Sequence, residues 1–209
     1  MKTASIENLL KQHHISTFSG VYLLAKELKL KALPIDKGGK VMFGSTVFAE
    51  LVDAVTEKFR INRVLDLFSG SGALSKIALL NGTQKAECAD IFTKAIAKNL
   101  VEFKNRIKVI EGDIFKMNFK EFYDLVLADT PSTLLIDFTK RVLPQLKTNL
   151  VIMYYGGKGN IERDKKIEVL CRKLFKEVLI IQKYGLKHMC CTSTSVGRKY
   201  LQFLKKRFS

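Results

Sequence analysis

A short apolar run at residues 124–128 ends abruptly in Asp129, a threonine, Pro131 and two more hydroxyl side chains, Ser132 and Thr133. A carboxylate at such a strand end can orient an incoming nitrogen or oxygen and accept its proton, and nearby hydroxyl groups can bind the same acceptor. The same stretch also fits a helix start, with Asp129 as the N-cap. We take Asp129, Pro131 and Ser132 as candidate catalytic residues and Thr133 as a candidate substrate contact.

A second candidate site is the turn in VLDLFSGSGALSKIAL, where Gly70 and Gly72 stand between an expected strand and an expected helix. Small residues let a ligand approach the backbone, and the free N–H groups of a helix start attract anionic groups. Asp66 precedes the turn, and Asp90 ends the next strand, where an acid meets ribose hydroxyl groups. Asp90 taken alone fits NAD as well as other nucleosides. Ser75 in the third glycine position and the acid before the turn favour a positively charged nucleoside, such as S-adenosylmethionine.

The elements that must position these residues alternate regularly after residue 62. Apolar runs predict strands at residues 63–68, 85–90, 107–112, 122–129, 149–155 and 176–184. Amphipathic spacing predicts helices at 5–14, 18–30, 45–59, 73–81, 92–103, 132–146 and 161–175. The last segments are expected to be an edge strand within 185–196 and a helix at 197–208. Strands that alternate with helices indicate βαβ units on a parallel sheet.

In this order the motifs resemble those of class I S-adenosylmethionine-dependent methyltransferases, over about residues 60–155. VLDLFSGSGA is similar to the first motif of that family. The resemblance implies that Asp66, Gly70 and Gly72 hold the methionine part of the cofactor S-adenosyl-L-methionine, with Phe68 as a further cofactor-binding residue.

The second and third motifs of the family have counterparts at the next two strand ends. CADI is similar to the second motif, which implies that Asp90 binds the ribose and that Ile91 lies against the adenine. EGDIF is similar to the third, which implies that Asp113 accepts from the adenine amino group and that the Ile114 N–H meets the ring.

The resemblance also implies an architecture. We expect an α/β fold, the Rossmann-like class I methyltransferase fold, with a mainly parallel seven-stranded sheet and helices on both faces. Residues 46–209 would be the methyltransferase domain. Residues 1–45 would be an N-terminal helical cap of the same unit.

The fourth motif bears on the substrate. DLFSGSGAL is especially similar to RNA methyltransferases that modify amino groups of guanine or adenine in ribosomal RNA. Their fourth motif is Asp/Asn-Pro-Pro-aromatic, whereas this chain has Asp129-Thr130-Pro131-Ser132. Ser132 also replaces the cysteine of the Asp-x-Pro-Cys motif in cytosine-C5 enzymes, and a hydroxyl group does not supply the thiolate that they need. Direct SN2 transfer to a nitrogen or oxygen is then the simplest mechanism.

The distribution of charge suggests a polyanionic partner. The net charge is +16, and residues 136–209 carry seventeen Lys and Arg against five Asp and Glu, or +12. Such a surface attracts nucleic acid, so we expect the substrate to be an RNA base in ribosomal or transfer RNA. The lysines could instead serve only solubility. The substrate would then be a small molecule or a protein side chain, and a non-catalytic RNA- or partner-binding module is a third reading.

Three basic residues are further candidates for substrate contact. Lys158 lies in the glycine-rich stretch YYGGKGN after the fifth expected strand, which also fits a plain loop. Arg198 and Lys199 follow the hydroxyl-rich CCTSTSV, where they could hold phosphates, although a polar edge strand fits equally.

The remaining composition narrows the class of protein. The four cysteines show no metal-binding spacing, so we expect reduced thiols and no metal. No stretch has the roughly 18 apolar residues of a membrane span, and we expect a cytoplasmic protein without membrane contact. The sequence does not determine an oligomeric state.

Overall fold

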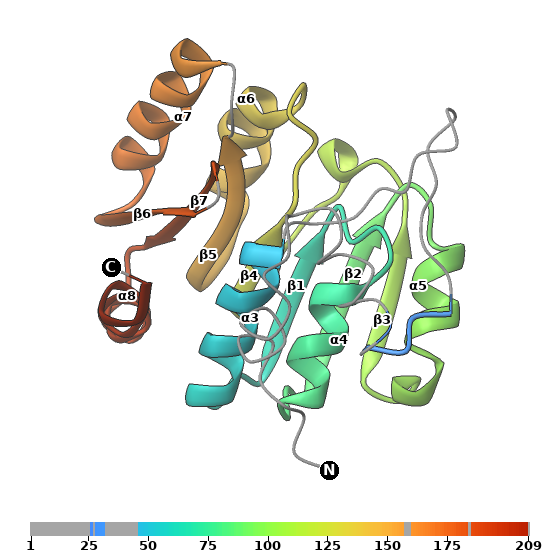
Figure 1. Ribbon diagram of the computed structural model, residues 1–209. Coiled ribbons are helices and arrows are strands. Elements are labelled where there is room, and N and C mark those ends of the chain that lie inside the picture. The colour runs from blue at the N-terminus through green and yellow to red at the C-terminus, as the bar shows by residue number, and fades with distance from the viewer. Residues whose placement is uncertain (1–25, 27, 32–45, 157–159, 184, 209) are drawn as a thin grey trace.

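The computed structural model describes residues 26, 28–31, 46–156, 160–183 and 185–208, which form a seven-stranded sheet between two layers of helices (Figure 1). The strand order is β3-β2-β1-β4-β5-β7-β6, and only β7 runs antiparallel to its neighbours. The strands are β1 Arg63–Leu67, β2 Lys85–Asp90, β3 Ile107–Glu111, β4 Phe122–Ala128, β5 Lys147–Gly156, β6 Glu177–Lys183 and β7 Leu186–Thr192. The predicted fold class, a mainly parallel sheet with helices on both faces, is confirmed.

One layer contains α3, α4, α5 and α8, and the other contains α6, α7 and the turns that continue α6. The helices are α3 Thr46–Lys58, α4 Ala73–Leu80, α5 Lys94–Asn99, α6 Leu135–Asp137, α7 Ile161–Leu174 and α8 Ser195–Phe208. Short helical turns are η1 Val101–Phe103, η2 Ile114–Lys116, the π-helical η3 Phe138–Val142 and η4 Leu143–Gln145. The helix predicted at 132–146 is therefore irregular, and one cause is Pro144, which has no N–H to continue an α-helical ladder.

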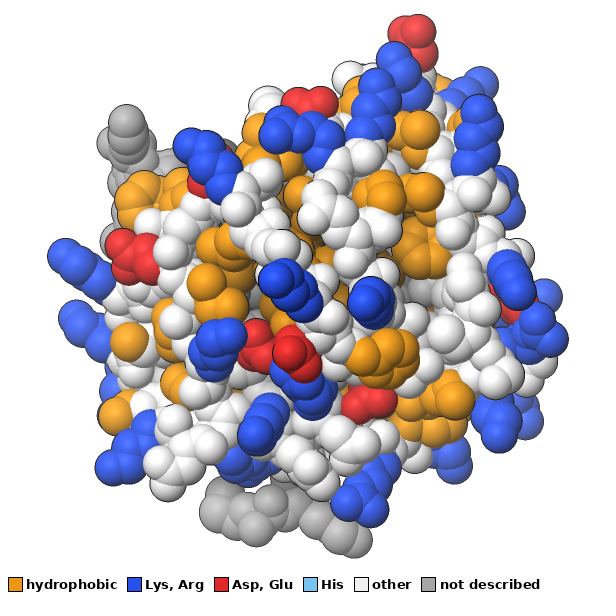
Figure 2. All heavy atoms as spheres, turned by 180° about the vertical axis from the view of Figure 1, so that it is seen from behind, with side chains coloured by type: hydrophobic (Ala, Val, Ile, Leu, Met, Phe, Trp, Pro, Cys, Tyr) orange, Lys and Arg blue, Asp and Glu red, His pale blue; other side chains and the backbone are white. Residues whose placement is uncertain are grey.

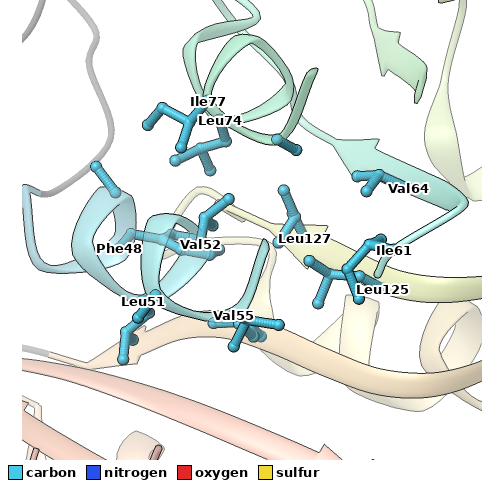
Figure 3. Close-up of a cluster of buried hydrophobic side chains, with 14 of the residues drawn as sticks. Phe48, Leu51, Val52, Val55, Ile61, Val64, Leu74, Ile77, Leu125 and Leu127 are labelled. Atoms are coloured by element: carbon cyan, nitrogen blue, oxygen red, sulfur yellow. The ribbon is translucent and has the colours of Figure 1, made fainter. Parts of the chain in front are cut away.

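The first helical layer is held by the apolar stripe of α3 (Figure 3). Phe48, Leu51, Val52 and Val55 follow the i, i+3, i+4, i+7 spacing of one helix face, and each is completely buried. Figure 3 shows Leu51 and Val55 over strand β5, with Leu74 and Ile77 of helix α4 on the other side of α3. Burial of each contributes about 1.5–3 kcal/mol, so α3 is fixed firmly over the centre of the sheet.

The prediction of an edge strand within residues 185–196 is wrong. β7 pairs with β5 through Val151 and Cys191 and with β6 through Val178 and the same Cys191. The side chains from His188 to Thr192 are all buried, as an interior strand requires. Residues 184 and 185 are too few for a crossover, so β6 and β7 form an antiparallel hairpin that inserts its second strand into the sheet.

The parallel strands define two edges of the sheet. We name the edge where β1, β4 and β5 end the carboxyl edge, and the opposite one the amino edge. α8 begins at the amino edge, where Gly197 packs so tightly on the Asn149 carbonyl and the Thr192 side chain that no Cβ would fit. Its last turn lies beside the end of β6, with the Lys183 Nζ atom 6.0 Å from the centre of the Phe208 ring.

The predicted helices at 5–14 and 18–30, and with them the predicted N-terminal cap, lie almost entirely outside the described residues. Of this part, Leu28 is buried against the α3 layer, and the Lys31 N–H donates to Asn99 Oδ1 at 2.7 Å. None of the described helices is both long enough and apolar enough to cross a bilayer.

Candidate functional site

Four side chains from four adjacent strands lie on one face of the sheet near its carboxyl edge. Asp90 ends β2, Asp66 is in β1, Asp129 follows β4, and Tyr154 is near the end of β5. The alternation of side chains places all four on the face covered by α3 and α4, because their neighbours two residues earlier belong to that core. Ala128 pairs with Met153, so the next residue on each strand brings Asp129 beside Tyr154.

Asp66 is the most deeply buried member of this group, with no exposed surface. Its Oδ2 atom accepts from the Ser75 hydroxyl at 2.7 Å and from the Ser75 N–H at 3.2 Å, which ties β1 to the first turn of α4. Its Oδ1 atom has no partner among the described residues. Burial, and to a smaller extent the charges of Asp129 and Asp90, raise the pKa of Asp66 to about 7. Asp66 thus positions the glycine turn and adds negative potential, but as it lies here it has no surface for direct ligand contact.

The glycine turn between β1 and α4 has an unusual backbone. Phe68, Gly70 and Gly72 have φ angles of 58°, 54° and 74°, in the left-handed region where glycine carries no penalty. A Cβ atom on Gly72 would lie only 3.1 Å from Leu100 Cδ1, so both backbone angle and space require glycine there. The Phe68 ring packs against Phe138 at 5.7 Å between ring centres, in the core of the opposite face. Phe68 is half-buried there, and its contact with a cofactor stays a prediction.

Asp90 connects the end of β2 to this turn. Its two carboxylate oxygens accept from the Gly70 N–H at 2.8 Å and from the Phe92 N–H at 3.0 Å. The half-buried carboxylate keeps further lone pairs for hydroxyl groups. Ile91 and Phe92 beside it are 56% and 71% exposed, which is a large apolar surface next to a charged group. Phe92 was missed by the sequence motif, because its position after the Ile carries no family signal.

Asp113 and Ile114 follow β3, further along the same edge. The Asp113 carboxylate accepts from the Phe115 N–H at 3.0 Å and thereby caps η2. Asp113 is exposed, whereas the Ile114 side chain is buried in the core of the opposite face. An adenine contact by Asp113 and by the Ile114 backbone stays a prediction.

Asp129 lies just past β4, half-buried at the carboxyl edge. It is not the cap of the following helix, because α6 begins only at Leu135 and its N-cap position is Leu134. That alternative for Asp129 is wrong. Its carboxylate has no hydrogen bond to any other described residue, and burial raises its pKa to about 6. The group is therefore poised to change protonation close to neutral pH.

The residues after Asp129 form a turn that exposes hydroxyl groups. The Pro131 carbonyl accepts from the Leu134 N–H at 2.8 Å. Ser132 and Thr133 are exposed, whereas the Thr130 hydroxyl is buried and has no partner within the described chain. The structure thus brings Ser132 and Thr133 to the edge where Asp129 lies, available to a ligand.

Two of the three predicted basic contacts lie at the amino edge. Arg198 and Lys199 are in the first turns of α8 at the amino edge, where Arg198 pairs with Glu177. The seven residue steps of β5 from Asn149 to Gly156 separate the two edges by about 20 Å. Lys158 lies outside the described residues. Arg198 and Lys199 lie there because the antiparallel β7 ends at the opposite edge from its parallel neighbours, and their contact with a substrate stays a prediction.

The residues at the carboxyl edge fit a nucleoside that carries positive charge. The charges of Asp90 and Asp129 are close enough to act electrostatically on Asp66. Gly70 in the glycine turn is half-buried, and exposed apolar side chains flank Asp90. S-adenosylmethionine offers ribose hydroxyl groups, an adenine ring and cationic groups that match these features. Among the described side chains, no group of His, Cys, Asp or Glu is placed to hold a metal ion.

Comparison with known proteins supports the fold. A structure from Pyrococcus horikoshii, described as a proposed RNA methyltransferase, aligns with a TM-score of 0.58 and 20% identity, covering 81% of this chain and 94% of that one. A ribosomal protein L11 methylase from Lactobacillus delbrueckii subsp. bulgaricus gives a TM-score of 0.58 and 17% identity, covering 79% and 91%. A structure described as a proposed methyltransferase in complex with S-adenosylhomocysteine gives a TM-score of 0.54 and 18% identity, covering 70% of this chain and 48% of that one. The chain has the fold of class I S-adenosylmethionine-dependent methyltransferases.

Comparison of sequences alone gives less information about the chain than comparison of structures. An uncharacterized protein of Methanocaldococcus jannaschii is 33% identical over 124 residues, which cover 58% of this chain. The match spans only 44% of that protein, less than half its length. No family profile matches the chain.

The buried carboxyl of Asp66 predicts a pH-dependent stability. Its folded-state pKa of about 7 lies above the ordinary value, so its contribution to stability is complete below about pH 4 and is lost as the pH rises through 7. Asp66→Asn cannot ionise. The unfolding free energy of this variant relative to wild type should therefore rise by on the order of 2–4 kcal/mol between pH 4 and pH 8, measured by urea unfolding. Asp137→Asn, at an exposed carboxylate of α6, is the control, and a pH-independent difference for Asp66→Asn contradicts the prediction.

Proposed function

We propose that the protein is an S-adenosylmethionine-dependent methyltransferase that transfers a methyl group to a nitrogen, or an oxygen, of an RNA base in ribosomal or transfer RNA. The observation that carries this proposal is the placement of Asp129. A half-buried carboxylate without a hydrogen-bond partner in the described chain lies one strand from the glycine turn, at the edge where this fold places its ligands.

Cofactor binding is assigned to the glycine turn and the acids around it. The backbone of Gly70 and Gly72 receives the methionine part, and the Asp90 carboxylate accepts from the ribose hydroxyl groups. Ile91 and Phe92 cover the adenine, with Asp113 at its amino group. S-adenosylmethionine supplies an electrophilic methyl group on a sulfonium, so the protein needs mainly to position the acceptor.

Asp129 orients the acceptor and takes its proton. Above about pH 6 its ionised carboxylate accepts a hydrogen bond from an amine, which directs the nitrogen lone pair toward the methyl group. Ser132 and Thr133 offer exposed hydroxyl groups to the same acceptor, and Pro131 shapes the turn that presents them. All four cysteines are buried, and burial raises the pKa of the Cys190 thiol to about 12. The chain therefore offers no activated thiol for covalent attack on a cytosine ring.

The choice of RNA is supported by charge. Residues 136–209 carry a net charge of +12, and Lys and Arg side chains are spread over the face shown in Figure 2. The last turn of α8 contributes the exposed Lys205, Lys206 and Arg207 beside the end of β6.

A protein side chain is the second candidate acceptor, because the L11 methylase aligns with the same TM-score as the proposed RNA enzyme. Incubation with labelled S-adenosylmethionine and separate RNA, protein and metabolite fractions distinguishes these acceptors.

Binding of S-adenosylmethionine is the first test. Calorimetry with the wild-type protein should detect binding, and Asp90→Ala should weaken it at least about tenfold, since a charged hydrogen-bond acceptor is lost. Glu57→Ala, at an exposed carboxylate near the end of α3, should bind as wild type does. The cofactor assignment fails if wild type shows no binding.

The role of Asp129 is tested by the rate of methyl transfer and by the pH dependence of that rate. Asp129→Ala should lower methyl transfer to RNA by about 100-fold or more, in the range for loss of a general base, with S-adenosylmethionine binding retained. The wild-type rate should rise between pH 5 and pH 7 with a midpoint near 6, because only the ionised carboxylate accepts the proton. Asp129→Asn retains a hydrogen-bond acceptor but should lose this rise. Asp137→Ala is the control, and full turnover by Asp129→Ala would refute the assignment.

RNA binding is tested by comparing two variants that remove the same positive charge at different edges of the sheet. Replacement of Lys205, Lys206 and Arg207 by glutamine should weaken binding of a mixed-sequence single-stranded RNA and reduce the slope of log K against log salt by about 2. The control removes equal charge at the amino edge, by replacing the exposed Lys147, Lys176 and Lys199 with glutamine. Equal effects of the two triple variants would show that RNA does not approach the carboxyl edge along α8.

A further inference from the structure

We propose that the ring of Tyr154 is the platform on which the target base stacks, in place of the aromatic residue that the fourth motif lacks. This inference rests on the proposed function and deepens it, since it assigns a binding site for a planar, nitrogen-containing ring. The site consists of the Tyr154 ring, the Asp129 carboxylate beside it and the exposed Ser132 hydroxyl.

Strand pairing places Tyr154 next to Asp129. β4 and β5 are parallel, and Ala128 pairs with Met153, so Asp129 and Tyr154 occupy the following register position at the carboxyl edge. Both side chains lie on the α3 face of the sheet, and the negative charge of Asp129 acts on the Tyr154 hydroxyl. The Tyr154 side chain is half-buried. Part of the residue is therefore open to solvent, at the register position beside the carboxylate that would hold the base's amino group.

The ring of Tyr154 is the first of three aromatic rings that pack against one another in a row. Its centre lies 5.7 Å from that of His188, with an edge-on geometry, and His188 lies 5.5 Å from Phe48 of α3. Burial lowers the pKa of His188 to about 3, so this support is an uncharged ring at physiological pH. Phe48 is completely buried, which fixes the row to the core. A ring held in this way loses little conformational entropy when a base stacks on it.

Three other aromatic side chains that the structure describes near this edge are not placed for the role. The Phe68 ring is turned into the opposite core against Phe138. Tyr155 is buried in that same core, and its hydroxyl donates to Glu168 at 2.9 Å. Phe92 is exposed but follows β2, two strands away from β4 and beside the carboxylate assigned to the ribose. Tyr154 is thus the aromatic residue that the described structure places directly beside Asp129.

The chemistry of the site specifies a class of acceptor. A tyrosine ring can stack on any planar heterocycle, and a neighbouring carboxylate selects those with an exocyclic amine. Burial raises the pKa of Tyr154, with Asp129 adding to the shift, so its hydroxyl stays protonated and the ring carries no charge. Adenine, guanine and cytosine meet these requirements in a single-stranded or flipped-out state. An aliphatic amine of a protein side chain does not.

Kinetics on RNA provide the first test. Tyr154→Phe keeps the ring and should methylate RNA with kcat and KM within about threefold of wild type. Tyr154→Leu removes it and should lower kcat/KM about 10- to 100-fold, in the range found for loss of one base–aromatic stack. Calorimetric binding of S-adenosylmethionine should be unchanged in both variants. Equal losses in the two variants, or near-normal transfer by Tyr154→Leu, would overturn the assignment.

Fluorescence separates failure of this inference from failure of the proposed function. The chain has no tryptophan, so Tyr154→Trp introduces a single reporter at the stacking position. Its emission should be quenched by a mixed-sequence single-stranded RNA in the presence of S-adenosylhomocysteine. Phe122→Trp, at a 48% exposed position at the start of β4, should not respond. Quenching without methyl transfer by wild type would support the platform and refute the proposed RNA methylation, and absence of quenching would refute the platform whatever the turnover.

Discussion

Parallel pairing of β2, β1, β4 and β5 is the constraint on which the site depends. Each of these strands delivers one polar or aromatic residue to the same face near the same edge, although 64 positions of the chain separate Asp90 from Tyr154. The register decides which side chains meet, because a shift by one residue would turn every side chain to the other face. The packing of α3 over the strands stabilises this register, and the chemistry at the edge follows from it.

The carboxylates of Asp66, Asp90 and Asp129 disfavour folding, but they favour binding of a positively charged ligand. Asp66 is buried beside two other acids, and its pKa of about 7 shows that its ionised form is unfavourable in the folded protein. The two hydrogen bonds from Ser75 offset part of this cost and hold the glycine turn in place. A ligand with positive charge would relieve the repulsion among the three acids. The unfavourable electrostatic energy of these acids is therefore concentrated at the place where a sulfonium nucleoside would reduce it.

Much of the fold could be predicted from the sequence, because the pattern is strong and local. The strand at 85–90 has the observed bounds, and the other strands differ by a few residues at most. The error at β7 has a physical cause. A strand buried on both faces has no alternation to distinguish it from an edge strand, and its place between β5 and β6 follows from a hairpin whose pairing partners are far away in sequence. The irregular α6 segment was likewise missed, because amphipathic spacing alone does not distinguish a continuous α-helix from one interrupted by π and 3-10 turns.

By itself the sequence determined the class of fold and the positions of the acids and glycines, because both depend on spacing along the chain. Only the tertiary structure decided how these residues work together. It showed that Asp66 supports the turn from within the core, that Asp129 caps no helix, and that Arg198 and Lys199 lie at the edge opposite to Asp129. It also brought Tyr154 beside Asp129, a proximity set by the register of two strands. Register is a property of paired strands and is not encoded in either strand alone, which is why the sequence could indicate where chemistry occurs but not which side chains surround it.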